Sequence, residues 1–202
     1  MRFGTKMFAH VTLVFLDRDG ILNRKPPEGS YVTCWEQFHL LPGVEQAIAR
    51  LNRSGRTVIL VTNQRGVALG HMTAADLEAI HQRLRDHLAP CGAHLDAIYT
   101  CPHDIGQCRC RKPDTGLFEQ AYADFPAARP GNSLMIGDSL SDIEAGRRLG
   151  MATIFIAGDP ATQKPDAERA AQLATVVAAS LPDCLDRYLL TGERAICGSE
   201  SL

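Results

Sequence analysis

The sequence predicts an α/β fold, a three-layer Rossmann-like parallel sheet with helices on both faces. Short apolar, β-branched runs alternate along the chain with segments of helical periodicity, which is the pattern of a parallel sheet with crossover helices. Polar residues directly follow several of the apolar runs, as expected where strand ends build a site. The 202 residues suit one compact domain, which we expect over 1–190, with 191–202 as a flexible tail.

The first half of the chain predicts five elements. In order, they are a strand over 11–16 (VTLVFL), a helix over 42–55, a strand over 57–63 (TVILVTN), a helix over 73–90 and a weaker strand over 94–100. Pro42 and Gly55 stand near the expected start and end of the first helix. Thr73 can cap the second helix, in which apolar residues such as Leu77 and Ile80 recur at spacings of three and four.

The second half continues the alternation. The expected elements are a helix over 116–125, a strand over 133–138 (SLMIGD), a helix over 141–150, a strand over 152–158 (ATIFIAG), a sixth strand over 174–180 (ATVVAAS) and a closing helix over 181–190. The strands are short runs rich in β-branched residues, and the helices carry charged residues between apolar ones. No further folding unit is predicted between them, so we expect a single domain without a cap.

Composition excludes several classes of function. The formal net charge is −2, which gives no argument for nucleic-acid or membrane binding. No apolar run reaches the roughly 18 residues of a membrane span, and the first apolar run reads as a strand rather than a signal peptide. Seven cysteines without a secretory signal indicate a reduced, cytoplasmic protein. We expect a monomer.

Two carboxylates lie at the end of the first strand. Asp17 and Asp19 are two residues apart, so an extended backbone points both side chains the same way. Such a pair is electrostatically costly unless a cation or a shared proton separates the charges, and Mg²⁺ suits oxygen ligands of this kind. A solvated strand end is the alternative interpretation of this motif alone.

Other strand ends favour the functional interpretation. Thr62 and Asn63 follow the second strand and can contact phosphate oxygens, and Lys112 stands before a proline that restrains its backbone. Asp138 follows the strand SLMIG, and Asp142 comes one helical turn later. Together these groups predict a site for a phosphoryl group and a metal ion.

A second cluster lies in the segment CPHDIGQCRCRKP. Cys101, His103, Cys108 and Cys110 have the ligand types and compact spacing of a tetrahedral Zn²⁺ site, and no ligand position is left open for a catalytic water. We therefore expect a structural zinc. A disulfide pair or incidental cysteines are the alternatives. Four other histidines are not at ligand spacing and are interpreted as surface or partly packed: His39, His81, His87 and His94.

The combined motifs resemble those of the haloacid dehalogenase (HAD) superfamily of phosphohydrolases. DRDG, VTN, RKP and IGDSLSD occur in the family's order across roughly residues 11–157. The resemblance implies that Asp17 is the nucleophile and Asp19 the general acid and base. It also implies that Mg²⁺ is bound by Asp17, Asp138 and the main-chain carbonyl of Asp19, while Thr62 and Lys112 hold the phosphoryl oxygens. Asp142 would support Lys112 or the metal shell, although an acid favoured by the helix dipole is a comparable interpretation.

The cysteine segment resembles the zinc loop of a cap-less branch that contains heptose bisphosphate phosphatases and histidinol-phosphate phosphatases. The segment NRKPPEGSYVTCWEQFHLLPGV and the run VTNQRG resemble the heptose enzymes, whereas the short zinc loop and Ser139, where many of those enzymes carry lysine, do not. The candidate substrate-binding residues are Gly29, Tyr31, Asn63, Gln64, Arg65 and Arg111. An exposed loop arginine is an equal interpretation of Arg65.

This resemblance implies Mg²⁺-dependent removal of the 7-phosphate from D-glycero-D-manno-heptose 1,7-bisphosphate, a small phosphorylated sugar. Histidinol phosphate or another small sugar phosphate is an alternative substrate. A non-catalytic, zinc-stabilised binding module is the alternative from a different class, and the complete set of acids argues against it.

Overall fold

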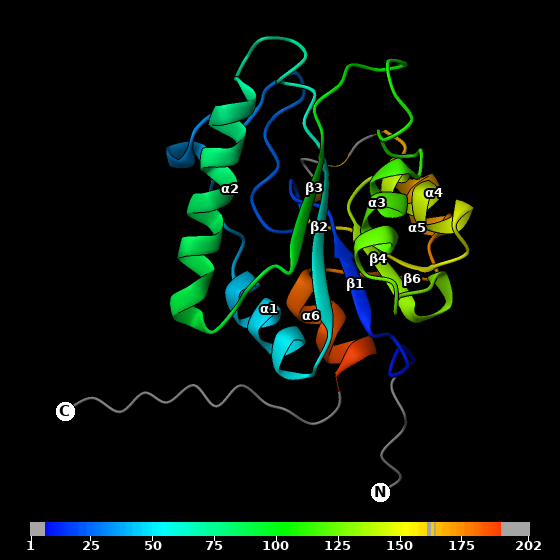
Figure 1. Cartoon of the computed structure of the whole chain (residues 1–202). Coiled ribbons are helices and arrows are strands. Elements are labelled where there is room, and N and C mark those ends of the chain that lie inside the picture. The colour runs from blue at the N-terminus through cyan, green and yellow to red at the C-terminus, as the bar shows by residue number, and fades with distance from the viewer. Residues whose placement is uncertain (1–6, 161–162, 164, 191–202) are drawn as a thin grey trace, which may run out of the picture.

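The computed structural model describes residues 7–160, 163 and 165–190, and its centre is a six-stranded sheet (Figure 1). The strands are β1 (Leu13–Leu16), β2 (Thr57–Asn63), β3 (Ala97–Cys101), β4 (Ser133–Gly137), β5 (Ala152–Ile156) and β6 (Val176–Ala178). All pairs are parallel, in the order β3-β2-β1-β4-β5-β6. The chain order reverses beside β1, so β1 and β4 stand at the point where a doubly wound sheet binds its ligand.

The central strand explains why the sheet needs a layer on each face. All four residues of β1 are buried, and successive side chains point to opposite faces. Val14 and Leu16 belong to one apolar cluster, whereas Leu13 and Phe15 belong to another. A strand that is apolar on both sides is typical of a parallel sheet covered by helices.

Helices form the two outer layers, as the sequence predicts. They are α1 (Val44–Arg53), α2 (Ala74–Leu88), α3 (Gly116–Asp124), α4 (Leu140–Arg148), α5 (Ala167–Leu173) and α6 (Leu181–Cys184). Residues of α1, α2 and α6 share the cluster that contains Val14, and residues of α3 and α4 share the cluster that contains Phe15. A third cluster joins α4 and α5 to Phe155 of β5. Figure 1 shows α1, α2 and α6 on one side of the sheet and α3, α4 and α5 on the other.

Most element boundaries agree with the prediction to within a few residues. Thr73 caps α2 as expected, because its hydroxyl accepts a hydrogen bond from the Asp76 main-chain N–H at 3.1 Å. Helix α5 is not predicted by the sequence, since its buried positions, Ala167 and Ala170, are small and give little hydrophobic periodicity. The predicted closing helix over 181–190 is wrong in part: α6 ends at Cys184 and a π-helical turn, Leu185–Leu189, follows.

The connections next to the site contain little regular structure. Residues 17–43 contain one 3₁₀ turn, Trp35–Gln37, and isolated bridges, and the segment from Pro102 to Thr115 contains neither helix nor strand. Two other 3₁₀ turns, Ala89–Cys91 and Pro130–Asn132, lie elsewhere. Across the described residues, no helix combines the length and apolar character needed to cross a membrane. The predicted tail, 191–202, falls outside these residues.

Candidate active site

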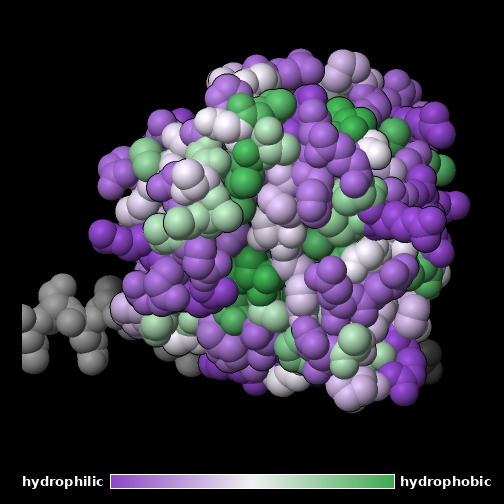
Figure 2. Space-filling view, turned by 45° about the horizontal axis from the view of Figure 1, so that its top comes forward, coloured by the Kyte–Doolittle hydropathy of each residue, from purple (hydrophilic) through white to green (hydrophobic). Residues whose placement is uncertain are grey.

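The predicted functional residues meet at the carboxyl ends of the strands, where they line one cavity of about 890 Å³. The lining includes Asp17, Asp19, Gly29, Tyr31, Thr62, Asn63, Gln64, Arg65, Arg111, Lys112, Asp138 and Asp142. Figure 2 brings this end of the molecule forward and shows a mainly hydrophilic surface with small hydrophobic patches. Residues far apart in the sequence thus form a single polar site, as the strand-end argument predicts.

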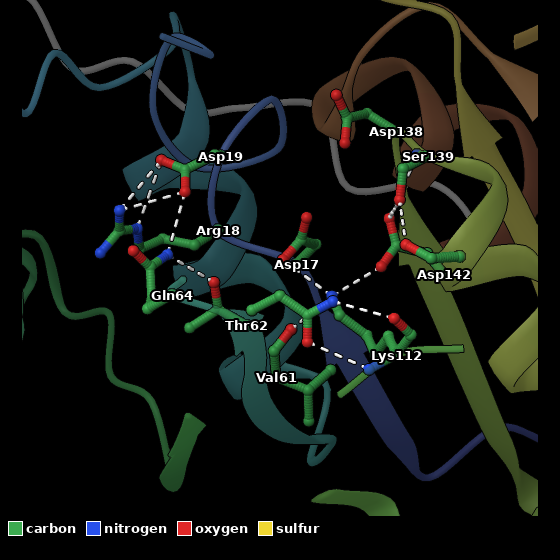
Figure 3. A network of polar contacts seen from close by, with 12 residues as sticks. Asp17, Arg18, Asp19, Val61, Thr62, Gln64, Lys112, Asp138, Ser139 and Asp142 are labelled. Carbon is green, nitrogen blue, oxygen red and sulfur yellow. Dashed lines mark hydrogen bonds and ion pairs between the residues drawn. The ribbon is translucent and has the colours of Figure 1, made fainter. Parts of the chain in front are cut away.

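Lys112 lies at the bottom of this site between two carboxylates (Figure 3). Its ammonium donates to Asp17 Oδ1 at 2.8 Å and to the main-chain oxygen of Val61 at 2.8 Å, and it pairs with Asp142 Oδ1 at 2.6 Å. Burial alone would lower the pKa of Lys112, but Asp142 and Asp17 outweigh it and raise the pKa. Lys112 is therefore a fixed cation beside the predicted nucleophile.

Three carboxylates are close enough to share a cation. One carboxylate oxygen from each of Asp17, Asp138 and Asp142 lies within 4.8 Å of the other two. Burial, with Asp142 and Asp138 nearby, raises the pKa of Asp17 to about 7 despite the opposing charge of Lys112. Hard oxygen donors at this spacing fit Mg²⁺. Gly20 makes the close approach possible, because a β-carbon there would lie 2.3 Å from Asp138 Oδ2.

Asp19 lies on the side of Asp17 opposite Asp142 and belongs to a separate group of hydrogen bonds (Figure 3). Its carboxylate accepts from Arg18 Nη2 at 3.1 and 3.0 Å, from Asn23 Nδ2 at 2.8 Å and from Gln64 Nε2 at 3.0 Å. Burial would raise the pKa of Asp19, but Arg18, Asn23 and Gln64 together lower it. The two aspartates of the motif therefore differ in environment: the pKa of Asp17 is raised and the pKa of Asp19 is lowered.

Two residues predicted to bind substrate also organise their neighbours. Asn63 accepts from the Lys112 main-chain N–H and donates to the Lys112 carbonyl, both at 3.1 Å, which fixes the backbone of that lysine. The buried Gln64 donates from the same nitrogen to Thr62 Oγ1 at 2.8 Å and to Asp19. Both side chains line the cavity, but these contacts use their polar groups for positioning.

Arg65 links loops at the rim of the cavity. Its guanidinium pairs with Asp104 of the cysteine segment, and hydrogen bonds to Asp104 and Tyr31 raise its pKa. Tyr31 in turn stacks on His71, with ring centroids 5.0 Å apart. Gly29 contributes a turn with φ of 78°. Three loops around the opening are therefore connected through one arginine.

The cysteine segment brings its four predicted ligands together. The Sγ of Cys108 lies 3.5 Å from that of Cys101 and 3.2 Å from that of Cys110. His103 Nδ1 lies 3.7 Å from the Cys101 sulfur and 3.3 Å from the Cys110 sulfur. A Zn–S bond of about 2.3 Å places two sulfurs of a tetrahedral site about 3.7 Å apart. The separations between the four side chains are close to this value, so they fit a zinc ion. The same sulfur separations exclude a disulfide in this arrangement.

Sequence reasoning missed three residues near the site. Lys25 pairs with Asp138 across the cavity, although only Gly29 and Tyr31 of its loop are predicted from the sequence to bind substrate. Arg18 is buried and paired with Asp19, and a charged residue between two motif acids was the available signal. The interpretation of His81 as surface or partly packed is wrong: the side chain is 1% exposed, because α2 turns it into the core.

Comparisons with known proteins identify relatives along most of the chain. A family model described as HAD-hydrolase-like matches residues 109–184. The chain is 41% identical over 144 residues to a D-glycero-alpha-D-manno-heptose-1,7-bisphosphate 7-phosphatase of Mycobacterium tuberculosis, covering 71% of this chain and 75% of the relative. It is 38% identical over 185 residues to a D-glycero-beta-D-manno-heptose-1,7-bisphosphate 7-phosphatase of Vibrio cholerae, covering 88% and 95%.

A solved structure shares the fold as well as sequence. It is the D,D-heptose 1,7-bisphosphate phosphatase from B. bronchiseptica, complexed with magnesium and phosphate. The match has a TM-score of 0.75 and 32% sequence identity, and it covers 86% of this chain and 95% of that one.

Proposed function

This chain belongs to the heptose-1,7-bisphosphate 7-phosphatase family of HAD-like phosphomonoester hydrolases, and we propose that it removes the 7-phosphate of D-glycero-D-manno-heptose 1,7-bisphosphate. The observation that carries the proposal is the convergence of Asp17, Asp138 and Lys112 from three separate segments onto one cavity. The relatives support an enzyme over a non-catalytic binding module, and relatives named for both anomers leave the preferred anomer to experiment.

In the first step, a carboxylate oxygen of Asp17 attacks the phosphorus of the 7-phosphate. The bond between phosphorus and the sugar oxygen breaks, and Asp19 gives that oxygen a proton. Lys112 and Thr62 hold oxygens of the transferring group, and the 2.8 Å contact between Lys112 and Asp17 supports this assignment. The products of this step are the heptose 1-phosphate and an aspartyl-phosphate at Asp17.

In the second step, water attacks the phosphorus of the aspartyl-phosphate. Asp19, now deprotonated, accepts a proton from that water, and the bond between phosphorus and Asp17 breaks to release inorganic phosphate. Asp17 and Asp138, with the main-chain carbonyl of Asp19, would hold Mg²⁺, which neutralises charge on the phosphoryl group. Asp142 acts through Lys112, with which it pairs.

The outer part of the cavity offers a cation, Arg111, for the phosphate that is not transferred. Arg111 Nη1 is buried and has no hydrogen-bond partner among the described residues, so a ligand oxygen can satisfy it. Lys25 lines the same cavity but pairs with Asp138, a proposed Mg²⁺ ligand, so it lies beside the reacting group. A buried cation beyond the reacting group suits a bisphosphate better than the single phosphate of histidinol phosphate.

We further propose that Cys101, His103, Cys108 and Cys110 bind a structural Zn²⁺. The segment between them contributes one large apolar side chain, Ile105, and that side chain is 66% exposed, so the loop cannot become rigid by packing. A metal would fix the loop and with it the position of Arg111 next to Cys110. Thiolate ligands require reduced cysteines, which supports a cytoplasmic location.

A kinetic comparison tests the proposed substrate. We expect kcat/KM for one anomer of the heptose 1,7-bisphosphate to exceed kcat/KM for histidinol phosphate by at least about 100-fold, since a missing phosphate contact costs several kcal/mol. Release of phosphate should depend on added Mg²⁺, and the product should retain its 1-phosphate. Equal turnover of both substrates would contradict the assignment.

A further inference from the structure

Arg18 stands between the two aspartates of the first motif and has no role in the reaction described above. Its side chain is 1% exposed, and its guanidinium spans both oxygens of Asp19, with Nη2 at 3.1 Å from Oδ1 and 3.0 Å from Oδ2. Nε lies 3.3 Å from Oδ1. A buried arginine that contacts both oxygens fixes the plane of the carboxylate as well as its position.

The surroundings direct the charge of Arg18 to that one carboxylate. Asp19 is the only acid paired with Arg18 among the described residues. The ring of Phe38 lies 5.7 Å from the guanidinium carbon, which is a cation–π contact rather than a competing anion. The buried His81 is also nearby. Burial and the charges of Arg18 and Arg85 lower its pKa to about 3, so His81 stays neutral and does not compete with Arg18 for the Asp19 carboxylate.

The remaining contacts of Asp19 show which donor can leave. Oδ1 also accepts from Asn23, and Oδ2 also accepts from Gln64, so Oδ1 already has three donor nitrogens and Oδ2 has two. A carboxylate has about four acceptor positions, and therefore Asp19 must release one donor before it can carry a proton. A neutral amide is held less strongly than a guanidinium, so the amide is released and the arginine contact remains.

We propose that Arg18 is a positioning residue that holds Asp19 in place while this carboxylate exchanges a proton with the leaving oxygen of the substrate. The proposal rests on the proposed function, in which Asp19 is the general acid and base. In the transfer step, the proton leaves Asp19 as the bond between phosphorus and the sugar oxygen breaks. In the hydrolysis step, the attacking water returns a proton to Asp19.

The leaving group provides the test. An alkyl phosphate leaves as a strongly basic alkoxide and needs the proton from Asp19, whereas p-nitrophenyl phosphate leaves as a weakly basic phenolate and does not. We would measure the single-turnover rate of phosphoryl transfer from both ester types in Arg18→Met, Arg18→Lys and Asp19→Asn. Arg50→Met is the matched control, because Arg50 is also a largely buried arginine in an ion pair, here with the exposed Asp186, but lies on α1, outside the cavity.

We expect Arg18→Met to slow transfer from the alkyl ester at least about tenfold more than transfer from the aryl ester, with partial recovery in Arg18→Lys. Arg50→Met should slow both esters equally or not at all. An equal loss for both esters in Arg18→Met would overturn the proposal, and if that variant does not fold, an equal loss in Arg18→Lys would do so. Absence of a selective loss in Asp19→Asn would instead refute the role of Asp19 itself, which separates the two failures.

Discussion

The ammonium of Lys112 lies 2.6 Å from the carboxylate of Asp142, and at most 1% of either side chain is exposed to solvent. Ser139 holds Asp142 from the other side, through its main-chain N–H at 3.1 Å and its hydroxyl, as part of a capping box at the start of α4. Gly137 leaves room for this acid, since a β-carbon there would lie 2.3 Å from Asp142 Cβ. Asp142 is thus more than a dipole-favoured acid: it is the second counter-charge of a buried lysine.

Asp142→Asn should lower the free energy of unfolding by about 3 kcal/mol, because loss of one partner leaves a buried charge poorly compensated. Urea unfolding measures this change. Asp114→Asn is the control, since its pair with Arg148 is about half exposed and should contribute about 0–1 kcal/mol. Equal effects of the two substitutions would contradict the role given to the buried pair.

Asp17→Asn should abolish turnover and preserve the fold. The amide has the shape of the acid but cannot form an aspartyl-phosphate, and the neutral side chain avoids the burial cost that raises the pKa of Asp17 to about 7. Phosphate release and far-UV circular dichroism measure the two properties. Substantial residual activity in the purified variant would refute the covalent mechanism.

Cys108→Ala should reduce both the zinc content and the activity, because three ligands hold the loop less firmly than four. Elemental analysis measures zinc per chain, and kcat/KM for the bisphosphate reports the effect of the loosened loop on activity. Cys91→Ala replaces an exposed cysteine outside the cluster and should change neither value. Unchanged zinc and kinetics in Cys108→Ala would argue against a structural metal.

Arg111→Gln should raise KM for the heptose 1,7-bisphosphate by roughly tenfold, the loss expected for one charge-assisted contact. KM for the corresponding 7-monophosphate should change much less, since that ester lacks the second phosphate. Arg111→Lys retains the charge and is the matched control. A similar rise for both esters would place Arg111 at the reacting phosphate instead.

His81 should make the fold sensitive to acid. Its pKa falls from 6.5 to about 3 on folding, so the unfolded chain binds the proton more tightly and stability is lost as pH falls below 6.5. Between pH 7.5 and 5 this amounts to about 2 kcal/mol. The unfolding free energy of wild type minus that of His81→Leu should fall by that amount as the pH falls over this range. His39→Leu, at an exposed histidine, is the control. A constant difference would contradict the prediction.

The sequence predicts the sheet and the strand-end residues because both depend on local patterns. Asp17, Thr62 and Asp138 follow apolar runs, and parallel strands place their carboxyl ends together. Contacts between distant loops leave no such pattern. The pair of Lys25 with Asp138 spans 113 positions, and the burial of His81 depends on how α2 packs beside the first motif.

The link from Arg65 to Asp104 and Tyr31 has a consequence for attempts to redesign selectivity. Segments separated by more than seventy positions in the chain share one guanidinium at the mouth of the cavity. Transplanting the Arg65 segment from a relative would leave the other two without their shared partner, and transplanting either of those would remove one of the two partners of Arg65. A successful chimera should therefore exchange all three together, and the strand ends beneath them can stay as they are.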